Sequence, residues 1–372
     1  MTRLLVVIPI AFLILSSKVT GWFGVVVGLG GLIFVHELGH FMVAKWMKLP
    51  VEVFSLGFGP RLLGFKWRET DVRLSALPLG GYVKLLGFNP EEPDAEDPYG
   101  FMHQPLWKRQ LFFAGGIIFN VLTAFIVLAC IGVSQSRVTK SETRGVIMEV
   151  KPGYPAAEAG LKGGEEVVAV GDISIRSSSD WDKAVAFIQS HPDQPMHLDL
   201  NTNGRLHRIE LVPKNENGVG RLGFQPALLE NPIAWRPIEL KDLGVGIRFA
   251  TIATPLQAWR ILVGYGRLLS GRESLKNVGG PGTIGKMAYQ FAQRGLIEFL
   301  GFVAFLSLNL AVLNALPIPF LDGGHMAILA FEKVRGRDLS ILVKERILMG
   351  GLILLGSLMI FVIVLDVIRF RQ

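Results

Sequence analysis

Long apolar runs alternate with charged segments along this chain. Residues 111–136, 299–321 and 347–365 contain no Asp, Glu, Lys or Arg, and each run reaches the roughly 18 residues that a membrane-spanning helix requires. A fourth apolar run, residues 22–44, would extend over roughly 35 Å as a helix, although it contains two histidines and a glutamate. The pattern predicts a polytopic α-helical membrane protein.

One more apolar stretch, residues 4–17, precedes these runs and contains Pro9. Such a stretch is either a short extra helix or a signal peptide. A signal peptide would need small residues around a cleavage site, and residues 17–21 match that pattern poorly. We therefore expect residues 1–21 to be an extra N-terminal hydrophobic segment that is retained.

The charges between the runs predict how the chain is oriented. Residues 45–109 carry nine Lys or Arg side chains and residues 332–346 carry five, which is typical of cytoplasmic loops. Residues 137–246 would then lie outside the cytoplasm. Residues 247–269 contain three arginines and a proline, so they fit an amphipathic helix on the membrane surface better than a further span. The net charge of +7 is explained by these loops and does not indicate nucleic-acid binding.

Residues 137–246 have the composition of a soluble domain. The apolar pattern predicts a β-sandwich with two helices: strands at 145–150, 166–172, 196–200 and 206–212, and helices at 154–161 and 181–190. This order resembles a bacterial PDZ domain, and the sequence of residues 151–161 is similar to a motif of that family. Gly163-Gly164-Glu165 stands where the family usually has Pro-Gly-Asp.

The polar residues inside the fourth apolar run form the sequence His36-Glu37-x-x-His40. On a helix this spacing places two imidazoles on one face with a carboxylate beside them, which suits two zinc ligands and a general base. A solvated helix with two histidines is the alternative. Ionisable groups are costly inside a membrane, so their location favours a metal site.

Two imidazoles leave a catalytic zinc short of a third protein ligand. Asp322 follows the helix-breaking Pro317 and Pro319 and precedes two glycines that permit close backbone approach. Irregular backbone at membrane depth must be buried in protein or line a cavity, so we predict that Asp322 is the third ligand. His325 is the competing candidate, and the alternative role for Asp322 is to cap the helix that follows.

Together these features resemble the bacterial site-2 proteases, over most of the chain. That family combines an HExxH helix, an inserted PDZ domain and an N-x-x-P-x-x-x-x-D-G motif, which matches residues 314–323. Further similarity covers residues 54–59, 77–84, 114–116 with Asn120, and 275–281. The single PDZ domain differs from relatives that carry two.

The resemblance implies an intramembrane zinc endopeptidase with one catalytic Zn²⁺. Glu37 would act as general base on a water activated by the zinc. Gly80, Gly81 and Tyr82 would belong to a hairpin that dips into the membrane and presents an edge to an extended substrate. Asn314 would bind the substrate backbone or the oxyanion, or would make a hydrogen bond between helices.

The resemblance also implies the setting of the reaction. The enzyme would lie in the cytoplasmic (inner) membrane of a bacterium, with the PDZ domain extracytoplasmic. Substrates would be single-span membrane proteins already cut by another protease, such as truncated anti-sigma factors or signal-peptide remnants.

The expected organisation has five parts. Residues 1–21 are the extra segment and residues 22–136 the N-terminal part of the membrane core. Residues 137–227 are the PDZ domain, 228–292 a linker with the surface helix, and 293–372 the C-terminal part of the core. The single cysteine, Cys130, excludes an intramolecular disulfide and a cysteine-based metal cluster.

Two other classes of function remain open from the sequence. One is a membrane-anchored PDZ scaffold that binds peptides and carries a structural or vestigial metal site, which would not need Glu37. The other is a metal transporter, which would need ligands distributed along several helices, where the remaining apolar runs offer little beyond Asn120 and Thr123.

Overall fold

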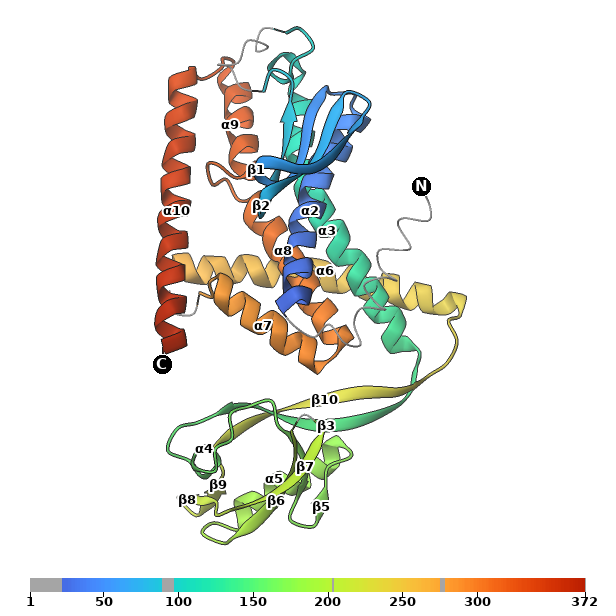
Figure 1. Cartoon of the computed structure of the whole chain (residues 1–372), viewed down its shortest axis with the longest axis vertical. Helices are drawn as coiled ribbons and strands as arrows, with labels where there is room; N and C mark the ends of the chain where they lie inside the picture. Colours follow the sequence, from blue (N-terminus) through green and yellow to red (C-terminus); the bar gives the residue numbers. More distant parts are fainter. Residues whose placement is uncertain (1–21, 89–96, 203, 275–277, 372) are drawn as a thin grey trace. The chain divides into compact units, whose positions relative to one another are not determined.

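The computed structural model describes residues 22–88, 97–202, 204–274 and 278–371 (Figure 1). The expected N-terminal segment, residues 4–17, lies outside the described residues. The chain divides into two compact units. One unit contains Met1–Val133 and Leu243–Gln372, and the other is Ser134–Asp242.

The first unit is built mainly from helices: α2 (Trp22–Trp46), α3 (Leu106–Ser136), α6 (Leu240–Leu269), α7 (Pro281–Arg294), α8 (Leu296–Ala315), α9 (Asp322–Arg335) and α10 (Ile341–Arg371). Of the described helices, α3, α8 and α10 are long and apolar enough to cross a membrane. Helices α3, α8 and α10 overlap the uncharged runs at residues 111–136, 299–321 and 347–365. Helix α2 overlaps the fourth apolar run, residues 22–44. The protein is therefore a membrane protein.

Helix α6 begins earlier than the sequence pattern indicates. The Asp242 carboxylate accepts a hydrogen bond from the Glu239 backbone N–H at 2.8 Å, which caps the first turn. The helix continues through Pro255 and is not among the candidate spans. Figure 1 shows α6 running crosswise to α10. Its position on the membrane surface stays a prediction.

A bent two-stranded sheet follows α2, formed by β1 (Val51–Trp67) and β2 (Thr70–Leu85). Phe54 of β1 pairs with both Val83 and Val72, and Val72 also pairs with Phe65. The start of β1 therefore lies between the first and the last part of β2. The last part of β2, from Gly81 to Leu85, pairs with β1 along one of its edges. A short 3-10 helix, η1 (Phe101–His103), leads into α3.

The second unit is rich in β-structure. Its six-stranded sheet has the order β10-β3-β4-β6-β7, with β5 paired to β4, and a separate pair is formed by β8 and β9. The strands are β3 (Val138–Val150), β4 (Glu166–Val170), β5 (Ile173–Ser174), β6 (Met196–Thr202), β7 (Arg205–Leu211), β8 (Lys214–Glu216), β9 (Val219–Arg221) and β10 (Phe224–Trp235), with helices α4 (Pro155–Glu158) and α5 (Ser178–Ser190).

The strands and helices expected between residues 145 and 212 are confirmed. Their inward side chains, including Ile147, Leu198 and Leu200, form one buried apolar cluster with Trp181 of α5. Strand β10 continues past residue 227, the expected end of this domain, because it stays paired with β3 as far as Trp235.

Candidate metal centre

Three potential metal ligands meet inside the first unit. His36 and His40 lie one turn apart on α2, and Asp322 is the first residue of α9. The two Nε2 atoms are 3.2 Å apart, and Asp322 Oδ2 is 3.2 Å from His36 Nε2 and 3.4 Å from His40 Nε2. The three atoms form a nearly equilateral triangle.

This triangle fits a tetrahedral zinc ion. Ligand bonds of about 2.0–2.1 Å at tetrahedral angles place ligand atoms about 3.3–3.4 Å apart. Asp322 Oδ2 is buried and receives no hydrogen bond from any residue that the structure describes, which is what a metal-directed oxygen requires. The donor set of two imidazoles and a carboxylate leaves a fourth position for water.

A hydrogen bond holds the second imidazole in the orientation that binding needs. His40 Nδ1 lies 2.8 Å from the Phe112 carbonyl oxygen, to which its N–H donates. The Nε2 lone pair of His40 is then free for a metal.

The Asn120 amide plays the same role for the first imidazole. His36 Nδ1 lies 3.1 Å from Asn120 Nδ2, whereas Asn120 Oδ1 is buried with no partner in the described part of the chain. Turning this amide by half a turn lets Oδ1 accept from the Nδ1–H and satisfies both groups. His36 Nε2 is then also the metal-binding atom.

Glycines allow α2 and α3 to cross closely enough for these contacts. A Cβ on Gly39 would lie 2.3 Å from the Gly115 carbonyl oxygen, so the two backbones touch. A Cβ on Gly116 would lie 2.5 Å from both His36 Cε1 and His40 Nε2. The surface of α3 at Gly116 is thus shaped to hold the two imidazoles.

The predicted base, Glu37, lies near the ligands and against Gly81 of β2. It is close enough to interact electrostatically with both histidines and with Asp322. A Cβ on Gly81 of β2 would lie 2.7 Å from Glu37 Cγ. The end of β2 is therefore adjacent to the metal centre.

The remaining predicted site residues occupy distinct positions. Asn314 lies near the end of α8 and is half-buried. Gly80 has a positive φ of 137° and packs against the Phe58 ring. The Tyr82 ring stacks on the same Phe58 ring, with 6.0 Å between the ring centroids. The Tyr82 hydroxyl accepts a hydrogen bond from Arg73.

The competing ligand, His325, is not part of this cluster. Its ring stacks on Phe113 with a centroid distance of 4.6 Å. Among the residues that the structure describes, the group of His, Cys, Asp and Glu side chains close enough to hold a metal ion contains His36, His40 and Asp322. The N-cap position of α9 is occupied by Leu321, and not by Asp322. The structure therefore brings Asp322, and not His325, to the two histidines.

Sequence reasoning missed the structural roles of Asn120, Gly116 and the Phe112 carbonyl. Asn120 is fully buried, and an uncharged polar residue inside an apolar run was the available signal. A backbone carbonyl gives no sequence signal at all.

Comparisons with known proteins agree with this geometry. The family model described as "Peptidase family M50" matches residues 24–358. A protein of Clostridium acetobutylicum is 30% identical over 345 residues, covering 92% of this chain and 96% of its own. A Clostridium perfringens protein is 33% identical over 339 residues, with 91% and 95% covered, and a Campylobacter jejuni protein is 31% identical over 377 residues, with 99% of each covered. All three bear the name "Putative zinc metalloprotease".

Proposed function

The chain belongs to peptidase family M50 and is a zinc metalloprotease, and we propose that it cuts transmembrane segments of single-span proteins within the bilayer. The observation that carries this proposal is the placement of the ligands. His36 and His40 lie in an apolar helix, and the third ligand faces them from the segment that follows a candidate span. A metal centre buried among such helices suits a substrate that is itself a membrane helix.

Each side chain around the centre has a definite task in this reaction. Bound zinc would polarise the scissile carbonyl and make water a better acid. Glu37 accepts the proton of the attacking water and returns it to the leaving amine. Asn120 and the Phe112 carbonyl hold the two imidazoles in their binding tautomers, so the ligands are positioned before substrate arrives.

The end of β2 is well placed to present the substrate. A helical substrate hides its carbonyls in hydrogen bonds, and adding it to a sheet edge would hold it extended. Gly81 to Lys84 pair with β1 on one side, and Gly81 lies against Glu37. We assign substrate contacts to Gly80, Gly81 and Tyr82 on this basis. Asn314 would contact the substrate backbone or the oxyanion, and the alternative is a hydrogen bond between helices.

The Ser134–Asp242 unit would act as a PDZ domain that limits which substrates are cut. A cavity of about 300 Å³ opens between α5 and the start of β10, and apolar side chains including Trp181, Ile188 and Phe224 line it. A groove between a helix and a strand suits an extended peptide. In this proposal the unit binds or excludes extracytoplasmic parts of substrates and leaves the chemistry to the first unit.

The location follows from the charge distribution. We place the protein in the cytoplasmic membrane of a bacterium, with the basic loops inside and the Ser134–Asp242 unit outside. A cysteine introduced at Asp180 should then react with an impermeant reagent from the outer side of intact cells. Labelling from the cytoplasm only would contradict this topology.

The direct test is cleavage by the purified protein. A model substrate with one transmembrane segment should be cut inside that segment, and a zinc chelator should stop the reaction until zinc is restored. Cleavage that persists after the metal has been removed would refute the proposal. A pure scaffold role predicts that no cleavage occurs under any condition.

A further inference from the structure

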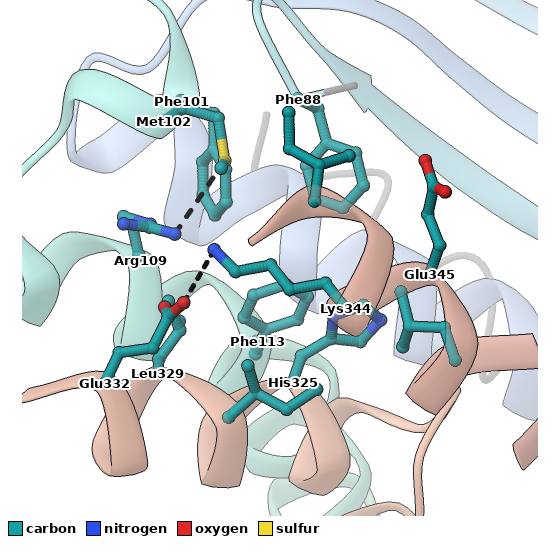
Figure 2. Close-up of a pocket in the computed structure, with 13 residues that line it drawn as sticks. Phe88, Phe101, Met102, Arg109, Phe113, His325, Leu329, Glu332, Lys344 and Glu345 are labelled. Atoms are coloured by element: carbon teal, nitrogen blue, oxygen red, sulfur yellow. Dashed lines mark hydrogen bonds and ion pairs between the residues drawn. The ribbon is translucent and has the colours of Figure 1, made fainter. Parts of the chain in front are cut away.

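A second cavity lies beyond the metal centre, and the proposed reaction does not use it. Its volume is about 250 Å³, near the small end of ligand pockets, and it lies between η1, α3, α9 and α10. Figure 2 shows aromatic and aliphatic side chains forming most of its wall. Phe88, Phe101, Phe113, Ile328, Leu329, Ile341 and Leu348 are among them.

Charged side chains of both signs also face this cavity. Figure 2 shows Arg109, Lys344 and Glu332 on one side, and Glu345 separate from them. Lys344 Nζ pairs with Glu332 Oε1 at 2.7 Å, and Arg109 is the second cation of the lining on this side, close enough to interact electrostatically with Glu332. The opposite side carries the charge of Glu345. The lining is therefore positive on one side and negative on the other.

The positive side has unused hydrogen-bonding capacity. Glu332 is 5% exposed, and its Oε2 atom has no hydrogen-bond partner in the described part of the chain. Arg109 Nε also has no hydrogen-bond partner in that part of the chain, although the guanidinium contacts Met102 Sδ at 3.8 Å and lies over the Phe101 ring at 5.7 Å from its centroid. Buried polar atoms without partners are costly, so a polar group that enters here would be stabilised.

The cavity lies where two candidate spans begin. Arg109 and Phe113 belong to the first turns of α3, and Lys344 and Leu348 to the first turns of α10. Trp107, beside Arg109, is 58% exposed, as is typical of side chains at the membrane–water interface. We therefore expect the charged lining to lie near the depth of lipid head groups.

We propose that this cavity binds the head group of a zwitterionic phospholipid of the phosphatidylethanolamine type. The phosphate would face Arg109, the ammonium would face Glu345, and the first part of an acyl chain would lie along the apolar wall. An anionic lipid would satisfy Arg109 but would bring no cation to Glu345, which lies on the exposed side of the cavity. The opposed charges of the lining thus match a head group that carries both signs.

Native mass spectrometry of the full-length protein in detergent tests this proposal. The protein is exposed to equal amounts of phosphatidylethanolamine and phosphatidylglycerol, and retained lipids are counted. We expect one retained phosphatidylethanolamine, with a preference of about tenfold, as for one charge-assisted hydrogen bond. Equal retention of both lipids, or no retained lipid, would overturn the proposal and leave a cavity that holds only water.

Matched variants locate the bound lipid. Arg109→Gln should weaken retention of both lipids about tenfold, and Glu345→Gln should abolish the preference. Arg335→Gln removes an exposed cation of α9 that does not line the cavity, and it should change neither value. Retention that falls equally in Arg109→Gln and Arg335→Gln would contradict the assignment.

A third variant covers the case in which Arg109→Gln does not fold. Leu348→Trp fills the cavity without changing a charge, and it should abolish the selective retention. Zinc content reports whether each variant retains its fold, since the metal ligands lie outside the lining. A folded Leu348→Trp protein that retains phosphatidylethanolamine as the wild type does would refute the proposed site.

Discussion

Replacing Gly116 by alanine tests whether α3 shapes the metal centre. The new Cβ would lie 2.5 Å from His40 Nε2 and from His36 Cε1. That is roughly 0.9 Å short of the 3.4 Å at which ordinary contact begins. Metal–ligand distances tolerate shifts of only about 0.2 Å, so at least one imidazole must leave its binding position.

The expected loss of zinc affinity in Gly116→Ala can be estimated from the typical effect of disturbing a metal site. Disturbing groups that orient a metal ligand typically lowers affinity ten- to hundredfold. Because a Cβ at Gly116 displaces the ligand rings directly, we expect about a hundredfold weaker zinc binding, or about 2.7 kcal/mol. Alanine is a better helix former than glycine by about 1 kcal/mol, so weakening of α3 itself cannot explain such a loss.

The assay is a zinc titration of the purified protein at buffered free-zinc concentrations, with metal content as the readout. Gly301→Ala is the matched control, because this α8 glycine has nothing within 4 Å of its added Cβ. Gly116→Ala should bind zinc weakly, and Gly301→Ala should bind as the wild type does. Equal affinity in the two variants would refute the reasoning that α3 positions the histidines.

Three other perturbations follow from the structure. Asn120→Leu should lower zinc affinity about ten- to hundredfold in the same titration, because it removes the partner of His36 Nδ1; unchanged affinity would contradict that role. The Arg236 guanidinium holds the pKa of Asp242 well below its usual 3.8, so the pair stabilises the Ser134–Asp242 unit above about pH 4, and this stabilisation is lost as pH falls further. Asp242→Asn should therefore lower the hydrogen-exchange protection of this unit at pH 7, and protection in the variant should decrease less than in the wild type as the pH is lowered. Wild-type protection in the variant would argue against a stabilising ion pair. Replacing residues 143–214 with a short flexible linker should keep cleavage of a truncated substrate and relax exclusion of the full-length one; loss of cleavage in a protein that still inserts and binds zinc would show that the unit presents substrate.

The metal ligands could be predicted because their signals are local. His36 and His40 stand at helical spacing in an apolar run, and their position in a membrane made an ordinary surface explanation implausible. The prediction of Asp322 needed one more argument: a zinc site with two histidines needs a third protein ligand, and few candidate side chains lie at membrane depth near the helix-breaking prolines. The structure places these three ligand atoms together.

The groups that support the ligands depend on how α2 and α3 cross. The contact of Gly39 with Gly115 sets that crossing, and it brings Gly116 and Asn120 against the two imidazoles. The pattern of apolar residues in α2 does not predict which residues of α3 it contacts, and the pattern in α3 does not predict its contacts on α2. Their roles therefore appear only in the folded chain.

The sheet formed by β1 and β2 was expected only through the family resemblance. β1 contains Gly57, Gly59 and Pro60, which interrupt the alternation that marks a strand. Its pairing is also irregular, because Phe54 meets two different segments of β2. Such pairing depends on the whole hairpin and cannot be derived from either strand alone.

The most direct test of the central claim is the behaviour of Glu37→Gln with a single-span model substrate. The change removes the general base but neither imidazole nor Asp322, so the variant should keep its zinc content. Cleavage within the transmembrane segment should be lost, whereas the wild-type protein cuts it in a zinc-dependent manner. Substantial turnover by a zinc-loaded Glu37→Gln protein would contradict the account.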